Sequence, residues 1–175
     1  MDELGDSQPT AVAAAALTRY SIPHTTLSWV IDHEPERAAK AFAMGMQMCL
    51  MIHGGEGTLA DVPELAELIG RMAALRERTA ARTTCARFND TVGLQIDGDD
   101  SLVAFGYDSP DGPAVIAAAP GTAASGTVTV DCDAFSAPGN AQERRLFRLD
   151  GSEEATHGDT LEFSLAANEA AVWTL

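Results

Sequence analysis

Five side chains able to bind or protonate a ligand lie at the ends of two apolar runs and in the polar stretches that follow them. Trp29 lies near the end of the first run, Asp32 and His33 follow it, and His53 and Glu56 follow the second run. Carboxylates and imidazoles can act as general acids and bases or bind sugar hydroxyls, and an indole ring can stack on a pyranose. The sequence therefore predicts a site for a carbohydrate or another small neutral ligand, and it predicts no cofactor.

The two apolar runs that precede these residues have the length of β-strands. They cover residues 26–31 and 46–52, and each is followed by an apolar pattern of helical period. This order predicts parallel strands joined by crossover helices, an arrangement in which ligands bind at the carboxyl ends of the strands. One helix over residues 36–52 is the alternative, because methionine and leucine favour helix. The glycines on either side of the second run favour the strand.

Structural roles are open for several of the same residues. Asp32 and Glu34 stand where they can cap the helix that follows the first strand. His33 and His53 could together hold a metal ion, as in a small metal enzyme. Each loop supplies only one histidine, without the HxH or HxxxH spacing that is typical of metal ligands. We therefore predict no metal site.

Three helices are expected in the first half of the chain. The alanine-rich segment after Pro9 predicts the first, up to about Tyr20. The second is expected to begin within residues 32–36, where three acidic residues suit the positive end of the helix dipole. Asp61 and Glu64 predict a capping box at the start of the third. Its apolar positions then recur at helical spacing: Val62, Leu65, Leu68, Ile69, Met72 and Leu75.

After residue 83 the apolar period changes from helical to alternating, and glycine, proline and aspartate separate the segments. We expect strands at 85–88, 92–96, 102–108, 114–119, 127–131, 143–149, 161–165 and 171–175. Short strands at such spacing are typical of an antiparallel β-sandwich. The predicted fold class is thus α/β followed by all-β, with a short linker at residues 79–84.

Composition excludes some partners. A net charge of −15 disfavours nucleic acid and anionic membranes, although the same acidity also serves solubility alone. No apolar stretch approaches the roughly 20 residues of a membrane span, and the acidic N-terminal segment is unlike a secretory signal. We expect a cytoplasmic protein. Cys49, Cys85 and Cys132 lack CxxC spacing, which predicts buried reduced thiols and not a zinc site or disulfides.

Four segments together resemble a known family. AFAMG at 41–45, the apolar run ending in glycines, PELAELI at 63–69 and the strands that end in AAVWTL look like the C-terminal end of glycoside hydrolases. These enzymes have a (β/α)8 barrel followed by a β-sandwich, as in α-galactosidase-like enzymes. The resemblance implies that residues 1–80 are the C-terminal part of a (β/α) barrel, with strands seven and eight at 26–31 and 46–52. Residues 81–175 would be the antiparallel β-sandwich.

The resemblance also implies a division of roles. The catalytic carboxylates of such enzymes come from earlier barrel strands, outside this sequence, so the chain would be a carbohydrate-processing portion that is not catalytic on its own. Its strand-end residues would line the sugar site: Trp29, Asp32, His33, His53 and Glu56. A companion polypeptide or a homo-oligomer would complete the barrel. The alternative is a stand-alone binding or assembly module that buries a methionine face against a partner: Met44, Met46, Met48 and Met51.

Overall fold

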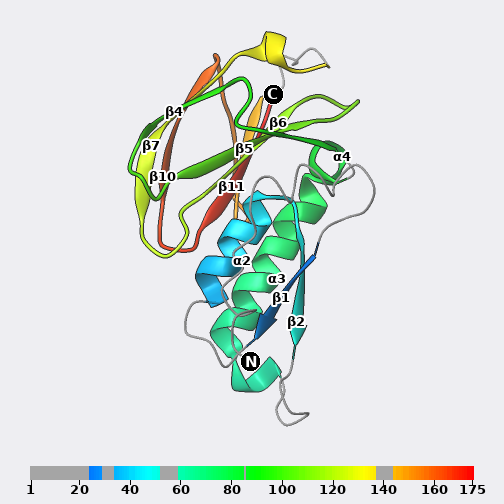
Figure 1. Ribbon diagram of the computed structural model, residues 1–175, viewed down its shortest axis with the longest axis vertical. Coiled ribbons are helices and arrows are strands. Elements are labelled where there is room, and N and C mark those ends of the chain that lie inside the picture. Colours follow the sequence, from blue (N-terminus) through cyan, green and yellow to red (C-terminus); the bar gives the residue numbers. More distant parts are fainter. Residues whose placement is uncertain (1–23, 29–33, 52–58, 85, 137–143) are drawn as a thin grey trace, which may run out of the picture.

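The computed structural model describes residues 24–28, 34–51, 59–84, 86–136 and 144–175. Two helices lie between a small parallel sheet and a larger pair of antiparallel sheets (Figure 1). The first predicted helix, up to Tyr20, lies outside the described residues. The order of elements otherwise follows the expected change from α/β to all-β.

Two strands, β1 (His24–Ser28) and β2 (Gln47–Met51), pair in parallel from His24 opposite Gln47 to Ser28 opposite Met51. Helix α2 (Glu34–Ala43) connects them. Gly45 follows this helix with a φ of +68°, a left-handed conformation that ends the helix and that glycine adopts without steric cost. The prediction of a strand in the second apolar run is therefore confirmed, and the single continuous helix is wrong.

Helix α3 (Pro63–Arg78) follows a short 3₁₀ turn, η2 (Leu59–Asp61). Pro63 occupies the first turn as expected, but the capping box is wrong. The N-cap is Val62, which makes no side-chain cap hydrogen bond, because the 3₁₀ turn places Asp61 one position too early. The predicted linker also contains a further helical turn, α4 (Ala80–Thr83).

The antiparallel part of the chain forms two sheets. The six-stranded sheet has the order β3-β5-β6-β11-β8-β9, and the three-stranded sheet has the order β10-β7-β4. Their strands are β3 (Arg87–Asp90), β4 (Leu94–Gly98), β5 (Val103–Asp108), β6 (Ala114–Ala118), β7 (Ala124–Val130), β8 (Arg145–Arg148), β9 (Glu153–Ala155), β10 (Thr160–Leu165) and β11 (Ala170–Thr174). A second 3₁₀ turn, η3 (Cys132–Ala134), follows β7. All eight expected strands are present with shifted ends, and β9 was not predicted.

The central strands of the six-stranded sheet, β5, β6 and β11, are buried on both faces. On one face, Ile116 and Val172 pack with α2 and α3 in a cluster that also contains Phe42. On the other face, Val115 and Trp173 pack against the three-stranded sheet. Strand β6 is therefore buried at every position. The division at residue 80 stays a prediction, and the helices share one core with the sheet that follows it.

Met44, Met46 and Met48 do not form an exposed face. Met44 and Met46 belong to the cluster between the helices and the six-stranded sheet, with exposed fractions of 2% and 7%. Met48 packs against the same cluster. The expectation that these three side chains are available to a partner protein is therefore wrong, because the chain's own core covers them. The side chain of Met51 is not described, and binding of a partner stays a prediction.

Candidate functional site

The parallel strands β1 and β2 end at the same edge of their sheet, because Ser28 lies opposite Met51. The segments after these two residues carry the predicted site residues: Trp29, Asp32, His33, His53 and Glu56. All five lie outside the described residues. The register thus brings Ser28 and Met51 together at this edge, and the positions of the five side chains stay predictions.

Glu34 is a buried carboxylate at the first position of α2, close in sequence to this edge. Its side chain is 1% exposed, and its Oε1 accepts a hydrogen bond from Arg37 at 2.8 Å. Its Oε2 has no hydrogen-bond partner among the described residues. Burying a carboxylate is costly unless a cation or donors compensate it, and Arg37 supplies only part of that compensation. Glu34 can therefore accept one more hydrogen bond at the base of the strand-end loop.

The burial of Glu34 was not predicted, since an acidic residue at a helix start was interpreted as a possible cap. The sequence does contain a signal for the ion pair of Glu34, although not for its burial. Glu34 and Arg37 are three positions apart, so a helix places them on one face as an ion pair. Nothing local indicates that this face is covered.

Strand β2 presents different side chains on its two faces. Met48 points toward the helices and packs on their core, whereas Gln47 and Cys49 are exposed. The expectation that Cys49 is a buried thiol is wrong for the described structure. An apolar run predicts burial only if something covers both faces of the strand, and no described element covers this one.

Two buried polar groups fix the turn between α2 and β2. Arg76 donates a hydrogen bond to the Met46 carbonyl at 2.9 Å, and its guanidinium lies 5.0 Å from the centre of the Phe42 ring. Tyr107 donates through its hydroxyl to the Ala43 carbonyl at 2.6 Å. Burial lowers the pKa of Arg76 and raises the pKa of Tyr107. Both groups hold main-chain carbonyls, which is a positioning role and not a chemical one.

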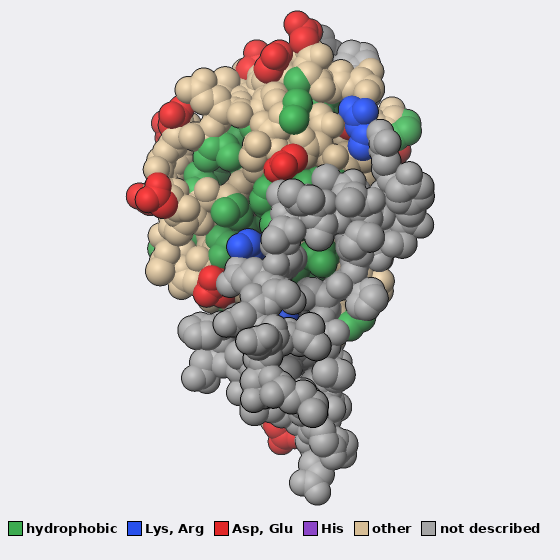
Figure 2. All heavy atoms as spheres, viewed as in Figure 1, with side chains coloured by type: hydrophobic (Ala, Val, Ile, Leu, Met, Phe, Trp, Pro, Cys, Tyr) green, Lys and Arg blue, Asp and Glu red, His purple; other side chains and the backbone are tan. Residues whose placement is uncertain are grey.

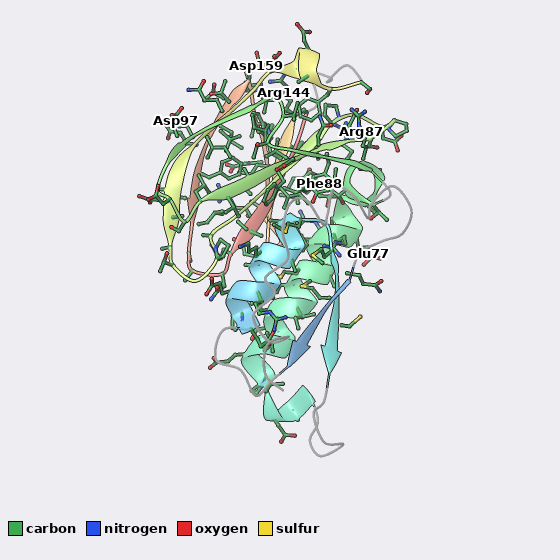
Figure 3. All side chains as sticks on the ribbon, in the orientation of Figure 1. Glu77, Arg87, Phe88, Asp97, Arg144 and Asp159 are labelled. Atoms are coloured by element: carbon green, nitrogen blue, oxygen red, sulfur yellow. The ribbon has the colours of Figure 1, made fainter. Side chains whose placement is uncertain are left out.

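A second polar cluster lies at the end of the sandwich far from the helices, where Figure 3 labels Arg144 and Asp159 close together. Arg144 forms an ion pair with Asp159 at 2.7 Å and donates to Cys132 Sγ at 3.4 Å and to the Gly158 carbonyl. Burial raises the pKa of Cys132. A raised pKa disfavours the thiolate, which is the nucleophilic form of cysteine, and Arg144 joins the segments that carry Cys132, Gly158 and Asp159. Cys85 lies outside the described residues.

The described part of the chain contains neither a cluster of metal-ligating side chains nor a membrane-spanning helix. Within these ranges, no three His, Cys, Asp or Glu side chains gather closely enough to hold a metal ion. Among the described helices, none combines the length and the apolar character that a membrane span requires. Acidic side chains are scattered over the visible face of the sandwich (Figure 2).

Comparisons with known proteins give structural matches only. No family model and no curated protein matches the sequence. The chain is similar in structure to glycoside hydrolases, in agreement with the resemblance seen in the sequence. One is a GH30 endoxylanase from Clostridium papyrosolvens C71, with a TM-score of 0.47 and 12% identity over 85% of this chain and 40% of the other. A GH27 β-L-arabinopyranosidase from Geobacillus stearothermophilus matches with a TM-score of 0.47 and 12% identity, over 82% of this chain and 30% of the other.

A maltogenic α-amylase from Thermotoga neapolitana matches with a TM-score of 0.47 and 10% identity, over 81% of this chain and 36% of the other. This chain therefore spans only 30–40% of the length of these three proteins. With TM-scores below 0.5, these likenesses define no activity for the chain.

Proposed function

We propose that the chain is the C-terminal portion of a carbohydrate-processing, glycoside hydrolase-like protein and that it is not catalytic on its own. In this proposal β1, α2, β2 and α3 form the end of a (β/α) barrel, and the two antiparallel sheets form the sandwich that packs on its last helices. The missing barrel strands come from a companion polypeptide segment, either in the same product or in a separate chain.

The observation that carries the proposal is the parallel sheet of β1 and β2, which has only two strands among the described residues. Parallel strands are normally found in sheets that are covered on both faces, and a two-stranded sheet has little stability by itself. Here α2 packs on the face of the sheet that carries Met48, while Gln47 and Cys49 are exposed on the other face. Further parallel strands would pair with the open edges and enclose that exposed face.

The position of the helices supports the same arrangement. In a (β/α) barrel the helices form the outer ring, and the inner face of the sheet encloses the barrel core. Helices α2 and α3 lie between β1–β2 and the six-stranded sheet (Figure 1). The sandwich would therefore pack on the outside of the barrel, and the exposed face of β2 would point to its interior.

The strand-end loops would contribute to the sugar site of the completed barrel. Ligands of such barrels bind at the carboxyl ends of the strands, which is where the five predicted residues follow β1 and β2. We propose that Trp29 stacks on a sugar ring and that Asp32, His33, His53 and Glu56 bind its hydroxyls. Glu34 would hold the first of these loops through its uncompensated oxygen. The catalytic carboxylates would belong to the companion segment.

Activity of the isolated chain tests the non-catalytic part of the proposal. The purified protein is incubated with a panel of aryl glycosides, and we expect no turnover above the buffer rate. Hydrolysis that disappears in Asp32→Asn or Glu56→Gln would overturn this part, because the catalytic groups would then lie in the chain itself. Asp97→Asn is the control, because it removes one carboxylate from the exposed surface of β4, outside the predicted sugar site.

Hydrogen exchange tests the incomplete sheet. We expect amides of β1 and β2 to exchange much faster than those of β6 and β11, because strands with open edges are protected only on one side. Equal protection of all four strands in a monomeric sample would contradict the need for companion strands.

A further inference from the structure

A pocket of about 290 Å³ lies where the end of α3 and the turn α4 meet strands β8 and β11. Its lining comes from both the helical and the sandwich parts of the chain: Arg78, Thr79, Ala81, Arg82, Arg145, Phe147 and Thr174. The pocket is separate from the proposed sugar site. Figure 1 shows α4 beside the sandwich, whereas the arrowheads of β1 and β2 point away from it.

We propose that this pocket binds a small oxyanion, through a phosphate or carboxylate group. Three arginines line it, Arg78, Arg82 and Arg145. Glu153 lies 3.6 Å from Arg78 and forms an ion pair with Arg145, and Arg82 donates to the main-chain oxygen of Leu175. Three cationic side chains therefore gather in a molecule whose net charge is −15.

Two of the three arginine side chains have contacts that hold them in place before any ligand binds. Arg82 donates through Nη1 to the main-chain oxygen of Leu175, and the guanidinium of Arg78 lies 5.2 Å from the centre of the Phe147 ring. The Thr174 hydroxyl donates to the Arg145 carbonyl at 3.3 Å and fixes the backbone of β8 beside the pocket. Guanidinium groups that are already ordered lose less entropy on binding a ligand.

Each of the three guanidinium groups keeps donors for a ligand. Within the described ranges, their hydrogen bonds and ion pairs use only Nη2 of Arg78, Nη1 of Arg82 and Nη1 of Arg145. An arginine has five N–H donors in a planar fork that suits the oxygens of phosphate and carboxylate. A cation near the C-terminal end of α3 interacts favourably with the negative end of the helix dipole. One arginine would be enough for this interaction, so the dipole does not explain why three arginines gather there.

The charge of the whole molecule restricts the ligand to a small one. A net charge of −15 repels an extended polyanion over its full length. At physiological ionic strength this repulsion is screened beyond about 8 Å, so a small anion inside the pocket interacts mainly with the nearby guanidinium groups. The ligand is thus a single phosphate or carboxylate group, either free or on a small metabolite, and not a nucleic acid.

The test measures binding of inorganic phosphate and of succinate to the full chain by calorimetry and by thermal unfolding, with chloride at matched ionic strength as the reference. At phosphate concentrations about ten times the Kd, we expect the Tm to rise by about 3–6 °C. Arg145→Gln should weaken binding about 10- to 100-fold, since it removes a charged donor. Glu153→Gln should strengthen it, because the competing carboxylate is lost.

Arg148→Gln is the matched control. Arg148 lies on the same strand as Arg145 and also forms an ion pair, with Glu154 at 3.0 Å, but it does not line the pocket. Its variant should bind like the parent chain. The side chain of Arg145 is 57% exposed, so its replacement leaves the core intact.

Succinate binding without phosphate binding would keep the oxyanion site and assign it to carboxylates. No binding of either probe would overturn the proposal. The same Tm shift in the parent chain, Arg145→Gln and Glu153→Gln would also overturn it, because a general salt effect does not depend on this pocket.

Discussion

Replacing Tyr107 by phenylalanine tests how firmly the sandwich holds the α2–β2 unit. Tyr107 lies on β5 with 2% of its surface exposed, and its hydroxyl donates to the Ala43 carbonyl at 2.6 Å. Ala43 is the last residue of α2, where carbonyl groups have no partner within the helix. This hydrogen bond thus joins the all-β part to the end of the helix that precedes β2.

We expect Tyr107→Phe to lower the free energy of unfolding by about 1–3 kcal/mol, because the buried carbonyl loses its donor. The aromatic ring remains, and so does its edge-on contact with Phe88, whose ring centre is 5.6 Å away. The loss is a sizeable part of the roughly 5–15 kcal/mol that stabilises a typical domain. For a chain of this size it corresponds to a Tm lower by about 2–12 °C.

Urea unfolding followed by circular dichroism gives the free energy, and hydrogen exchange shows whether α2 loosens. Thr129→Val is the control, because it removes a hydroxyl that bonds to Thr160 at 2.9 Å on the exposed surface. The control should change stability by less than about 0.5 kcal/mol. A Tyr107→Phe variant with unchanged stability and unchanged exchange in α2 would refute the role given to this hydroxyl.

Gly45→Ala should destabilise the chain by about 1–2 kcal/mol or more, because φ is +68° and the new Cβ would lie 2.9 Å from the Tyr107 hydroxyl oxygen. The double variant with Tyr107→Phe should cost less than the sum, and additive losses in urea unfolding would contradict the contact. Asp159→Asn should lower stability by less than about 1 kcal/mol at pH 7, since this carboxylate is mostly exposed. A hydrogen bond from Arg144 lowers the pKa of Asp159, so its stabilisation is present above the unfolded pKa of about 4 and disappears as the pH falls through the folded pKa. Equal differences between the variant and the parent at pH 7 and pH 2 would contradict this. Cys49 should react with a maleimide in the native isolated chain, as measured by mass spectrometry, because it is exposed. A protected Cys49 would mean that the open face of β2 is covered.

Local patterns predicted most of the elements, and their failures have physical causes. The apolar spacing predicted α3 correctly, because its buried face consists of residues at that spacing: Leu65, Leu68, Met72 and Leu75. Strand β9 was missed since Glu153, Glu154 and Ala155 are all exposed and have no apolar alternation to detect. It exists only because β8 offers an edge for pairing.

The candidate sites differ in how far the sequence could indicate them. The strand-end site rests on two apolar runs, each followed by polar residues. The parallel pairing of β1 and β2 agrees with the predicted strands, and the site itself stays a prediction. The arginine pocket has no such local signal. Arg78 and Arg145 are 67 positions apart in sequence and meet because α3 packs beside β8 and β11.

The amino-acid sequence by itself determined most of the helices and strands in the described ranges, because periodicity, glycine turns and proline positions act over a few residues. Tertiary structure decided which faces are buried and which distant side chains meet. Burial depends on what covers a surface, so the apolar Met44 is enclosed by the sheet while Cys49, five positions later, faces outward. The same long-range packing brings three arginines together in a chain that is otherwise strongly acidic.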